Sequence, residues 1–274
     1  MKFSELKNFS KSIRKKIIKI ANLSNSPHVG TCLSCVDILV ALYFYKLNLE
    51  PWECRDIFIL SKGHGAMALY ATLNERGFIS DKELLGYYQN NGTLPAHLDR
   101  VTSKYIEASA GSLGHGFNIG LGWAYGFKVQ SSKLNVENAE NRKREVFALI
   151  GDGETQEGSI WEGAMFAAKL GLNNFTAIID RNDLQGYGRP SEICYFEPLE
   201  DKWRSFGWNV FRVNGHNFEE IISALDEPHN DRPKIIIADT VKGKGVSFME
   251  DQLKWHYFIV TDEIRNKALK ELES

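Results

Sequence analysis

The chain has 274 residues, 43% of them hydrophobic, which is enough for one large α/β domain or at most two small ones. Its formal net charge is −2, so it lacks the strong basic excess of a nucleic-acid-binding protein. No apolar run reaches the roughly 18 residues of a membrane span, and the N-terminal segment lacks a signal-peptide core, so we expect a cytoplasmic protein without membrane partners.

The first half of the sequence predicts helices around a single buried strand, residues 56–60. Ser34-Cys35-Val36-Asp37 and Ser80-Asp81-Lys82-Glu83 both resemble capping boxes, which open helices. Apolar residues recur at helical spacing over 4–21, which predicts a first helix there. Three more helices are expected: from Ser34 to about 45, from the end of segment 61–65 to about 77, and from Ser80 to about 88. Residues 91–110 look irregular.

The second half alternates strands and helices. Strands are expected over 146–150, 175–180, 210–213 and 235–238, and helices over 116–129, 157–170, 198–206, 217–225 and 262–273. Residues 131–144 are polar without an apolar period and are expected to form a surface loop. Continuous apolar strands that alternate with helices indicate an α/β fold with a parallel sheet covered on both faces. No domain boundary stands out, so residues 1–274 are expected to form a single domain.

Cys32 and Cys35 are spaced as in a CxxC motif. The spacing fits a redox pair, half of a zinc site, or two small buried residues at a helix start. No second CxxC and no suitable histidine pair completes a zinc site. We therefore favour the buried pair, and the four cysteines of the chain fit a reducing compartment.

Polar side chains follow two successive strands. Gly151-Asp152-Gly153-Glu154 comes directly after one strand and ahead of a helix, and Asn182 follows the next strand. Carboxyl ends of parallel strands form the ligand edge of open α/β sheets, glycine lets an anion approach closely, and helix N-termini favour phosphate. Asp152, Asn182, a carbonyl near Leu184, two diphosphate oxygens and a water would complete an octahedral Mg²⁺ site. Taken alone, the GDG segment is more often a simple turn than a metal site.

These two segments, GDGETQEGSIWE and IIDRNDLQGYG, resemble the thiamine diphosphate signature of the transketolase family, with Asn182 placed 30 residues after Asp152. Further segments resemble family motifs in the same order: Pro27-His28-Val29-Gly30, Ser61-Lys62-Gly63-His64, Leu94-Pro95-Ala96-His97, Gly111-Ser112-Leu113-Gly114, and Lys242-Gly243-Lys244-Gly245 with Trp255-His256. The resemblance covers nearly the whole chain. It implies a thiamine diphosphate-binding fold and a separate N-terminal transketolase subunit.

The resemblance also implies a cofactor site. Mg²⁺, or Ca²⁺ or Mn²⁺ in its place, is expected on Asp152, Asn182 and the carbonyl of Leu184. Thiamine diphosphate is expected to contact His64, Gly111, Ser112, Leu113, Gly151, Asp152, Gly153, Glu154 and Asn182.

Four of the seven histidines fall in matched motifs. Imidazole titrates near neutrality and can serve as acid, base or hydrogen-bond donor. The resemblance places His64 near diphosphate and substrate, and His28, His97 and His256 along the substrate funnel, although any single histidine can also be merely structural. Val29, Thr31, Ala96 and Leu98 replace the usual family residues there, which leaves the substrate open.

Glu157 resembles the family glutamate at the contact between subunits and is counted with the four histidines as catalytic, although an acidic first-turn residue is also ordinary. In this family the cofactor-activating glutamate lies on a pyrimidine-binding domain, for which no segment remains before Ser274. We therefore expect inactivity alone, a C-terminal partner chain and a dimer of heterodimers.

The expected reaction is transfer of a two-carbon ketol group from a ketose, phosphorylated in our expectation, to an aldose. The alternatives are a non-catalytic cofactor-binding scaffold and half of a deoxyxylulose-phosphate-synthase-like enzyme. The sequence leaves the donor, the acceptor and the pathway open.

Overall fold

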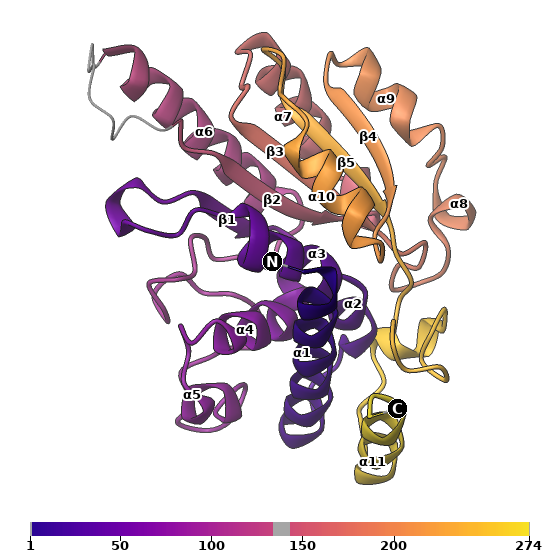
Figure 1. The fold of residues 1–274 in the computed structure, drawn as a ribbon. Coiled ribbons are helices and arrows are strands. Elements are labelled where there is room, and N and C mark those ends of the chain that lie inside the picture. The colour runs from indigo at the N-terminus through magenta and orange to yellow at the C-terminus, as the bar shows by residue number, and fades with distance from the viewer. Residues whose placement is uncertain (1, 134–142, 274) are drawn as a thin grey trace.

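The computed structural model describes residues 2–133 and 143–273 and contains a five-stranded sheet (Figure 1). The strands are β1 Ile57–Leu60, β2 Val146–Gly151, β3 Phe175–Arg181, β4 Asn209–Asn214 and β5 Lys234–Asp239. Their order is β1-β2-β3-β5-β4, and every neighbouring pair is parallel. The predicted parallel sheet is confirmed, and each predicted strand matches an observed one closely at both ends.

The strand register brings the candidate ligand residues to one edge. Gly151 of β2 pairs with Asp180 of β3, and Arg181 of β3 pairs with Asp239 of β5. Three central strands therefore end almost level, and the segments that follow them leave the sheet side by side.

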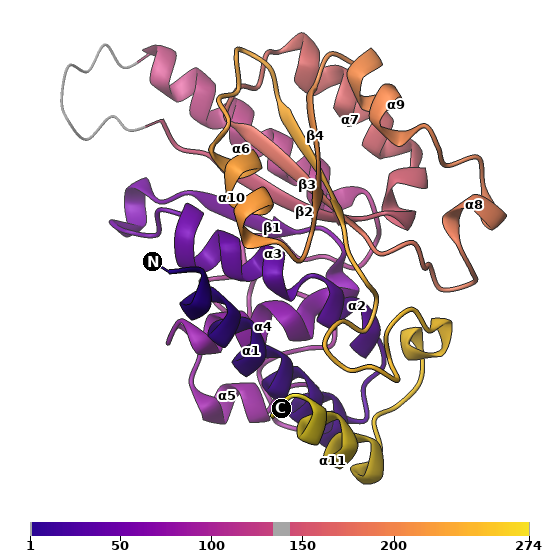
Figure 2. The ribbon, with the colours of Figure 1, turned by 45° about the vertical axis from the view of Figure 1, so that its right-hand side comes forward.

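Helices cover both faces of the sheet, and several short helices connect them (Figures 1 and 2). The α-helices are α1 Phe3–Ser24, α2 Val29–Ser34, α3 Val36–Ala41, α4 Ala66–Glu75, α5 Asp81–Leu85, α6 His115–Lys133, α7 Gly158–Lys169, α8 Pro190–Ile193, α9 Leu199–Ser205, α10 Phe218–Asp226 and α11 Asp262–Glu271. A π-helical turn covers Leu42–Lys46, and 3₁₀ turns cover Trp52–Cys54, Gly63–Gly65, Gly153–Gln156 and Leu253–His256.

Strand side chains alternate between two apolar clusters, as the two-residue period of a strand requires. Phe147 and Leu149 of β2 belong to the cluster under α1, α3, α4 and α10, whereas Val146 and Ala148 belong to the cluster under α6, α7 and α9. Because both faces of every central strand are buried, these strands are apolar throughout rather than alternating.

Helix ends test the capping predictions. At α5, Ser80 Oγ accepts from the Glu83 amide at 3.2 Å and the Glu83 carboxylate accepts from the Ser80 amide at 2.8 Å, so this capping box is confirmed. The box predicted at Ser34 is wrong. Ser34 is the last residue of α2, and its hydroxyl lies 2.6 Å from the Asp180 carboxylate instead of capping α3. Tertiary hydrogen bonding has replaced a local one.

Two other expectations concern loops. Residues 91–110, all of them described, contain no helix or strand, as predicted. Most of the expected surface loop at 131–144 lies outside the described residues, but α6 continues to Lys133 and so occupies its first part. Within the described segments, no helix combines the length and the apolar character that a membrane crossing demands.

Candidate cofactor site

The ends of β2 and β3 meet at the predicted metal ligands. Asp152 is 4% exposed and Asn182 is 6% exposed. One Asp152 carboxylate oxygen accepts from the Asp183 amide and the other from the Gly153 amide, both at 2.7 Å. The Asn182 side-chain oxygen accepts from the Leu184 amide at 3.2 Å. The prediction that adjacent strand ends bring these segments together is therefore confirmed.

A lysine that our sequence reasoning gave no role lies at this site. Lys242 follows β5 and is 1% exposed. Its Nζ donates to the Leu184 carbonyl, the predicted metal ligand, at 2.8 Å, and lies 2.8 Å from His256 Nδ1. Lys242 thus connects the candidate metal site to the histidines. The available signal was a lysine directly after a strand of the same parallel sheet, within a segment already matched to the family.

The residues present fit a divalent cation and a diphosphate. A carboxylate, an amide oxygen and a carbonyl are the hard oxygen ligands that Mg²⁺ takes, and the Leu184 carbonyl already accepts from an ammonium group. Burial, and then the nearby Asp180 charge, raise the pKa of Asp152 to about 6, so a cation would stabilise its ionised form.

A hydrogen-bond donor without a partner among the described residues lies beside the GDG turn, where a diphosphate is expected. Within the described part of the chain, the Gln185 side-chain N–H group is buried without a partner. The amide carbon of Gln185 would lie 2.9 Å from a Cβ at Gly153, so the Gln185 side chain packs directly against the GDG turn. A buried polar group without a partner is costly, and a diphosphate oxygen would satisfy it.

Three of the four predicted catalytic histidines surround the fourth. The ring of His28 lies 5.5 Å from that of His64, 6.0 Å from that of His97 and 5.1 Å from that of His256, measured between ring centroids. His28 precedes α2 with a left-handed backbone (φ 71°), and its amide donates to the His256 carbonyl at 2.9 Å. Four segments distant in sequence therefore deliver one imidazole each to a single cluster.

The environment keeps most of these rings neutral. Burial, followed by the charges of His97 and Lys242, lowers the pKa of His28 to about 4. Burial and Lys242 lower the pKa of His256 to about 3, and burial holds the pKa of His64 well below its usual value. An ammonium can only donate, so His256 accepts from Lys242 at Nδ1 and carries its proton on Nε2. Neutral rings can donate and accept at once, as binding a sugar hydroxyl requires.

The other predicted residues divide between the site and the surface. The segment Gly111-Ser112-Leu113 precedes α6, and a Cβ at Gly111 would lie 3.8 Å from the His97 ring. Glu154 is buried, and its carboxylate is turned into the protein. Glu157 is exposed and occupies the N-cap position of α7 without a capping hydrogen bond from its side chain, and a Cβ at Gly114 would lie 3.2 Å from Glu157 Cβ.

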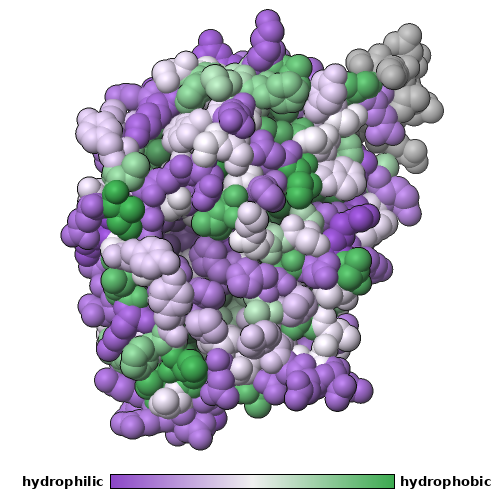
Figure 3. Space-filling view, turned by 180° about the vertical axis from the view of Figure 1, so that it is seen from behind, coloured by the Kyte–Doolittle hydropathy of each residue, from purple (hydrophilic) through white to green (hydrophobic). Residues whose placement is uncertain are grey.

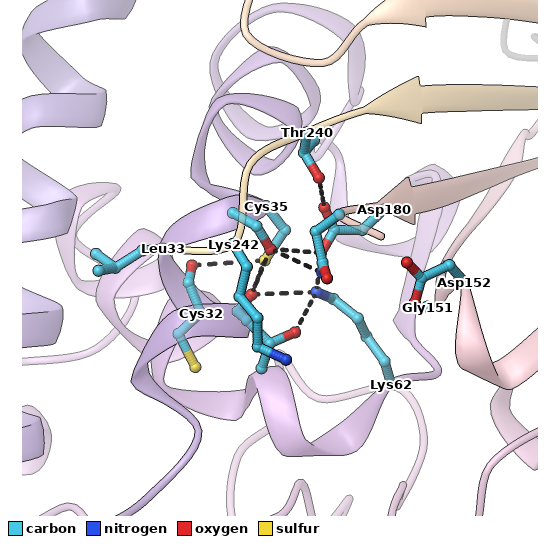
Figure 4. A network of polar contacts seen from close by, with 12 residues as sticks. Cys32, Leu33, Cys35, Lys62, Gly151, Asp152, Asp180, Thr240 and Lys242 are labelled. Atoms are coloured by element: carbon cyan, nitrogen blue, oxygen red, sulfur yellow. Dashed lines mark hydrogen bonds and ion pairs between the residues drawn. The ribbon is translucent and has the colours of Figure 1, made fainter. Parts of the chain in front are cut away.

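The cysteines and a second buried lysine lie behind this site (Figure 4). Cys32 and Cys35 are free and fully buried, which confirms the favoured interpretation. Among the described residues, no group of three or more His, Cys, Asp or Glu side chains could hold a metal. Beside them, Lys62 Nζ lies 2.5 Å from Asp180, whose carboxylate also accepts from Ser34 and Thr240.

Comparison with known proteins agrees with this geometry. The sequence matches the family described as "Transketolase, thiamine diphosphate binding domain" over residues 6–270. The fold and the site therefore define a thiamine diphosphate-binding domain. The chain belongs to the transketolase family.

Similar proteins indicate which kind of family member this is. A 6-deoxy-6-sulfo-D-fructose transketolase subunit from Clostridium sp. (strain MSTE9) is 40% identical, with 98% of this chain and 96% of the relative covered. An apulose-4-phosphate transketolase subunit from Actinobacillus succinogenes is 37% identical, with 100% and 98% covered. The crystal structure of transketolase from Campylobacter jejuni aligns with a TM-score of 0.91 at 28% identity over 100% of this chain but only 43% of that chain. The chain is accordingly an N-terminal transketolase subunit.

Proposed function

We propose that this subunit holds thiamine diphosphate through Mg²⁺ and transfers a two-carbon ketol group from a ketose to an aldose. The observation that carries the proposal is the meeting of Asp152, Asn182 and the Leu184 carbonyl at neighbouring strand ends, with Lys242 linking them to the histidine cluster. In this proposal the chain acts as one cofactor-binding domain, and Mg²⁺ can be replaced by Ca²⁺ or Mn²⁺.

The chain's own residues have defined tasks in this proposal. Asp152, Asn182 and Leu184 hold the metal, and the glycine-rich turns at 111–113 and 151–153 receive the diphosphate, with Gln185 as an additional donor. Bound thiamine diphosphate supplies the carbanion chemistry. The four histidines of the cluster bind the sugar hydroxyls and move protons, and the Nε2–H of His256 is held ready by Lys242.

The substrate class is a sugar or sugar phosphate. Two relatives are named for a sulfonated fructose and for apulose 4-phosphate. Both names describe sugars that carry an anionic group, which supports a donor or acceptor of that kind here. The buried cation Lys242 at the inner end of the site belongs to the cofactor in this proposal, and we propose that the partner chain recognises the sugar's anionic group.

A partner chain completes the enzyme in this proposal, within a cytoplasmic dimer of heterodimers. The "subunit" names of the relatives support a partner. So does an open, shallow surface along one side of α6, lined by Ile119, Trp123 and Phe127 among others. Helices α6 and α7 lie on the face that Figure 3 shows, where apolar side chains are interspersed among polar ones. Exposed Glu157 precedes α7, and we propose that it meets the partner there.

Reconstitution with the partner tests the proposal. The chain is co-purified with a protein that carries a pyrimidine-binding domain, and ketol transfer is followed with Mg²⁺, thiamine diphosphate and a panel of phosphorylated and sulfonated ketoses. We expect turnover only when both chains are present. A folded pair that binds the cofactor but turns over no sugar would favour the non-catalytic scaffold. Turnover of pyruvate with glyceraldehyde 3-phosphate would favour the deoxyxylulose-phosphate-synthase-like alternative.

Asp152→Ala tests the metal centre separately from turnover. Removing the carboxylate should weaken Mg²⁺-dependent thiamine diphosphate binding by at least about a hundredfold, because it removes a charged ligand from a site with few others. Calorimetric titration with and without Mg²⁺ measures this loss. Asp201→Ala is the matched control, because the Asp201 side chain is 70% exposed on α9. Equal affinity in both variants would contradict the proposed site.

A further inference from the structure

The carboxylate of Glu154 is buried in the protein behind the turns at 111–113 and 151–153, which are proposed to bind the diphosphate. Glu154 is 1% exposed. One carboxylate oxygen accepts from the Ser61 hydroxyl at 2.5 Å and from the Gly114 amide at 2.8 Å. The other oxygen accepts from the Gly151 amide at 3.1 Å. Three donors thus converge on one buried anionic group.

Each donor belongs to a different segment with a proposed cofactor contact. Ser61 follows β1 and precedes His64, Gly114 ends the turn before α6, and Gly151 is the last residue of β2, where the GDG turn begins. We propose that Glu154 is a positioning residue that holds these three segments in the arrangement that receives the diphosphate. This inference rests on the proposed function, and it assigns Glu154 an indirect role in place of the direct cofactor contact that the sequence resemblance implies.

The segments approach one another through their backbones at glycines. A Cβ at Gly116 would lie 2.7 Å from Ser61 Cα, and a Cβ at Gly63 would lie 2.4 Å from the Ala110 carbonyl oxygen. Gly114 also has a positive φ of 82°, which favours glycine. Glycine has no side chain with which to hold two segments together. The Glu154 carboxylate, which all three segments share, supplies the directional hydrogen bonds that the glycine contacts lack.

Glutamine cannot reproduce this arrangement. A carboxylate offers acceptor positions on both oxygens, whereas a glutamine amide offers one oxygen and one donor group. In Glu154→Gln, either the Gly151 amide or the pair of donors at Ser61 and Gly114 would face an N–H group. A buried donor without a partner is unfavourable, so one turn would move to find water or another acceptor. Cofactor binding would then have to restore the original arrangement, which lowers affinity.

Hydrogen–deuterium exchange of the chain without cofactor tests the positioning directly. We expect Glu154→Gln to accelerate amide exchange by about tenfold or more in at least one of the segments 111–116 and 151–153. The reason is that each lost hydrogen bond to the carboxylate lowers the free energy of local opening by an amount worth about one to two powers of ten in exchange rate. Glu162→Gln, an exposed change on α7, should leave both segments unchanged. Unchanged exchange at the two turns in folded Glu154→Gln would overturn the inference.

Calorimetry of thiamine diphosphate with Mg²⁺ separates positioning from general stability. We expect a dissociation constant about tenfold to a hundredfold higher in Glu154→Gln than in the wild type. A residue needed only for stability would lower the unfolding midpoint while leaving affinity unchanged, and that result would also overturn the inference.

A second variant guards against a folding defect. Glu154→Asp keeps the charge but shortens the side chain by one methylene, so it should keep some of the three contacts and show an intermediate effect in both measurements. If Glu154→Gln does not fold, exchange and affinity equal to wild type in Glu154→Asp would contradict the inference. If wild-type chain, alone and with its partner, binds no thiamine diphosphate, the proposed function fails, while the exchange comparison still decides whether Glu154 positions the turns.

Discussion

Two buried lysines at the same edge of the sheet differ in what surrounds them. Lys62 is 0% exposed and Lys242 is 1% exposed. Lys62 has the Asp180 carboxylate at 2.5 Å and two oxygens of Thr31 within hydrogen-bond distance. Lys242 has a carbonyl and an imidazole nitrogen, and among the described residues no carboxylate lies within ion-pair distance of its Nζ. Figure 4 shows the dashed contacts gathering at Lys62 and Asp180.

The two environments act oppositely on the ammonium groups. Burial by itself lowers the pKa of a lysine. At Lys62 burial is the largest single influence, but the charge and the hydrogen bond of Asp180, together with the neighbouring Cys35 and Cys32, outweigh it and raise the pKa above its usual value. At Lys242 burial prevails over the more distant Asp152 charge and lowers the pKa to about 8. The Lys62–Asp180 ion pair is already neutralised within the folded chain. Lys242 is a buried cation without a carboxylate partner among the described residues, so a bound anion would stabilise its charged form. The comparison therefore separates a lysine that is paired within the fold from one that has no carboxylate counterion among the described residues.

Lys62→Met should have the largest effect on stability. It leaves the Asp180 carboxylate buried without its cation, and breaking a buried pair in this way costs about 3–5 kcal/mol. We expect the free energy of unfolding, measured by urea denaturation, to fall by that amount. The double replacement Lys62→Met with Asp180→Leu should recover part of the loss, because no charge is then left unpaired. A single variant as stable as the wild type would show that the pair does not hold this region together.

Lys242→Met should separate stability from binding. The change removes a buried charge that has no carboxylate partner within residues 2–133 and 143–273, so the cofactor-free chain should keep its stability or gain about 1 kcal/mol. Affinity for thiamine diphosphate with Mg²⁺ should fall about tenfold or more, because the anion loses a charge-assisted contact. Urea denaturation and calorimetry on the same preparation measure both quantities. A large loss of stability with normal affinity would reverse the roles assigned to the two lysines.

Thr240→Val should have the smallest effect on the free energy of unfolding. It tests how much the hydrogen bonds to Asp180 contribute beside the Lys62–Asp180 ion pair. The Thr240 hydroxyl donates to Asp180 at 2.5 Å and is one of several groups that stabilise that carboxylate. Valine keeps the shape and removes the donor. We expect a loss of about 1–2 kcal/mol in unfolding free energy and unchanged cofactor affinity. If stability falls as far as in Lys62→Met, the hydrogen bonds rather than the ion pair dominate at Asp180.

Local patterns predicted most of the elements because they depend on neighbours in the sequence. The apolar runs of β2, β3 and β5 identified buried strands, and Gly171 and Gly207, with φ of 56° and 86°, mark the helix ends where they were expected. The error at Ser34 has the opposite origin. Its hydroxyl bonds to Asp180, a residue 146 positions away, so no local motif could predict its role.

The candidate site shows the same division. Asp152 and Asn182 could be located from the sequence because parallel strands necessarily end at a common edge. The role of Glu154 could not, because its burial beneath three turns depends on how β1, α6 and β2 pack. Lys242 lies in a segment that resembles a family motif. That its side chain contacts Leu184 and His256 could not be predicted, because these contacts depend on the path of the chain after β5.

The sequence by itself determined the alternation of strands and helices, the parallel sheet and the placement of ligand residues after two strands. These features follow from periodicity and from the rule that side chains at strand ends share an edge. Only the tertiary structure decided which buried lysine is paired with a carboxylate, which lysine lacks one among the described residues and where Glu154 points. Such outcomes depend on contacts between segments far apart in the chain, and burial changes the energy of a charge more than any local pattern reveals.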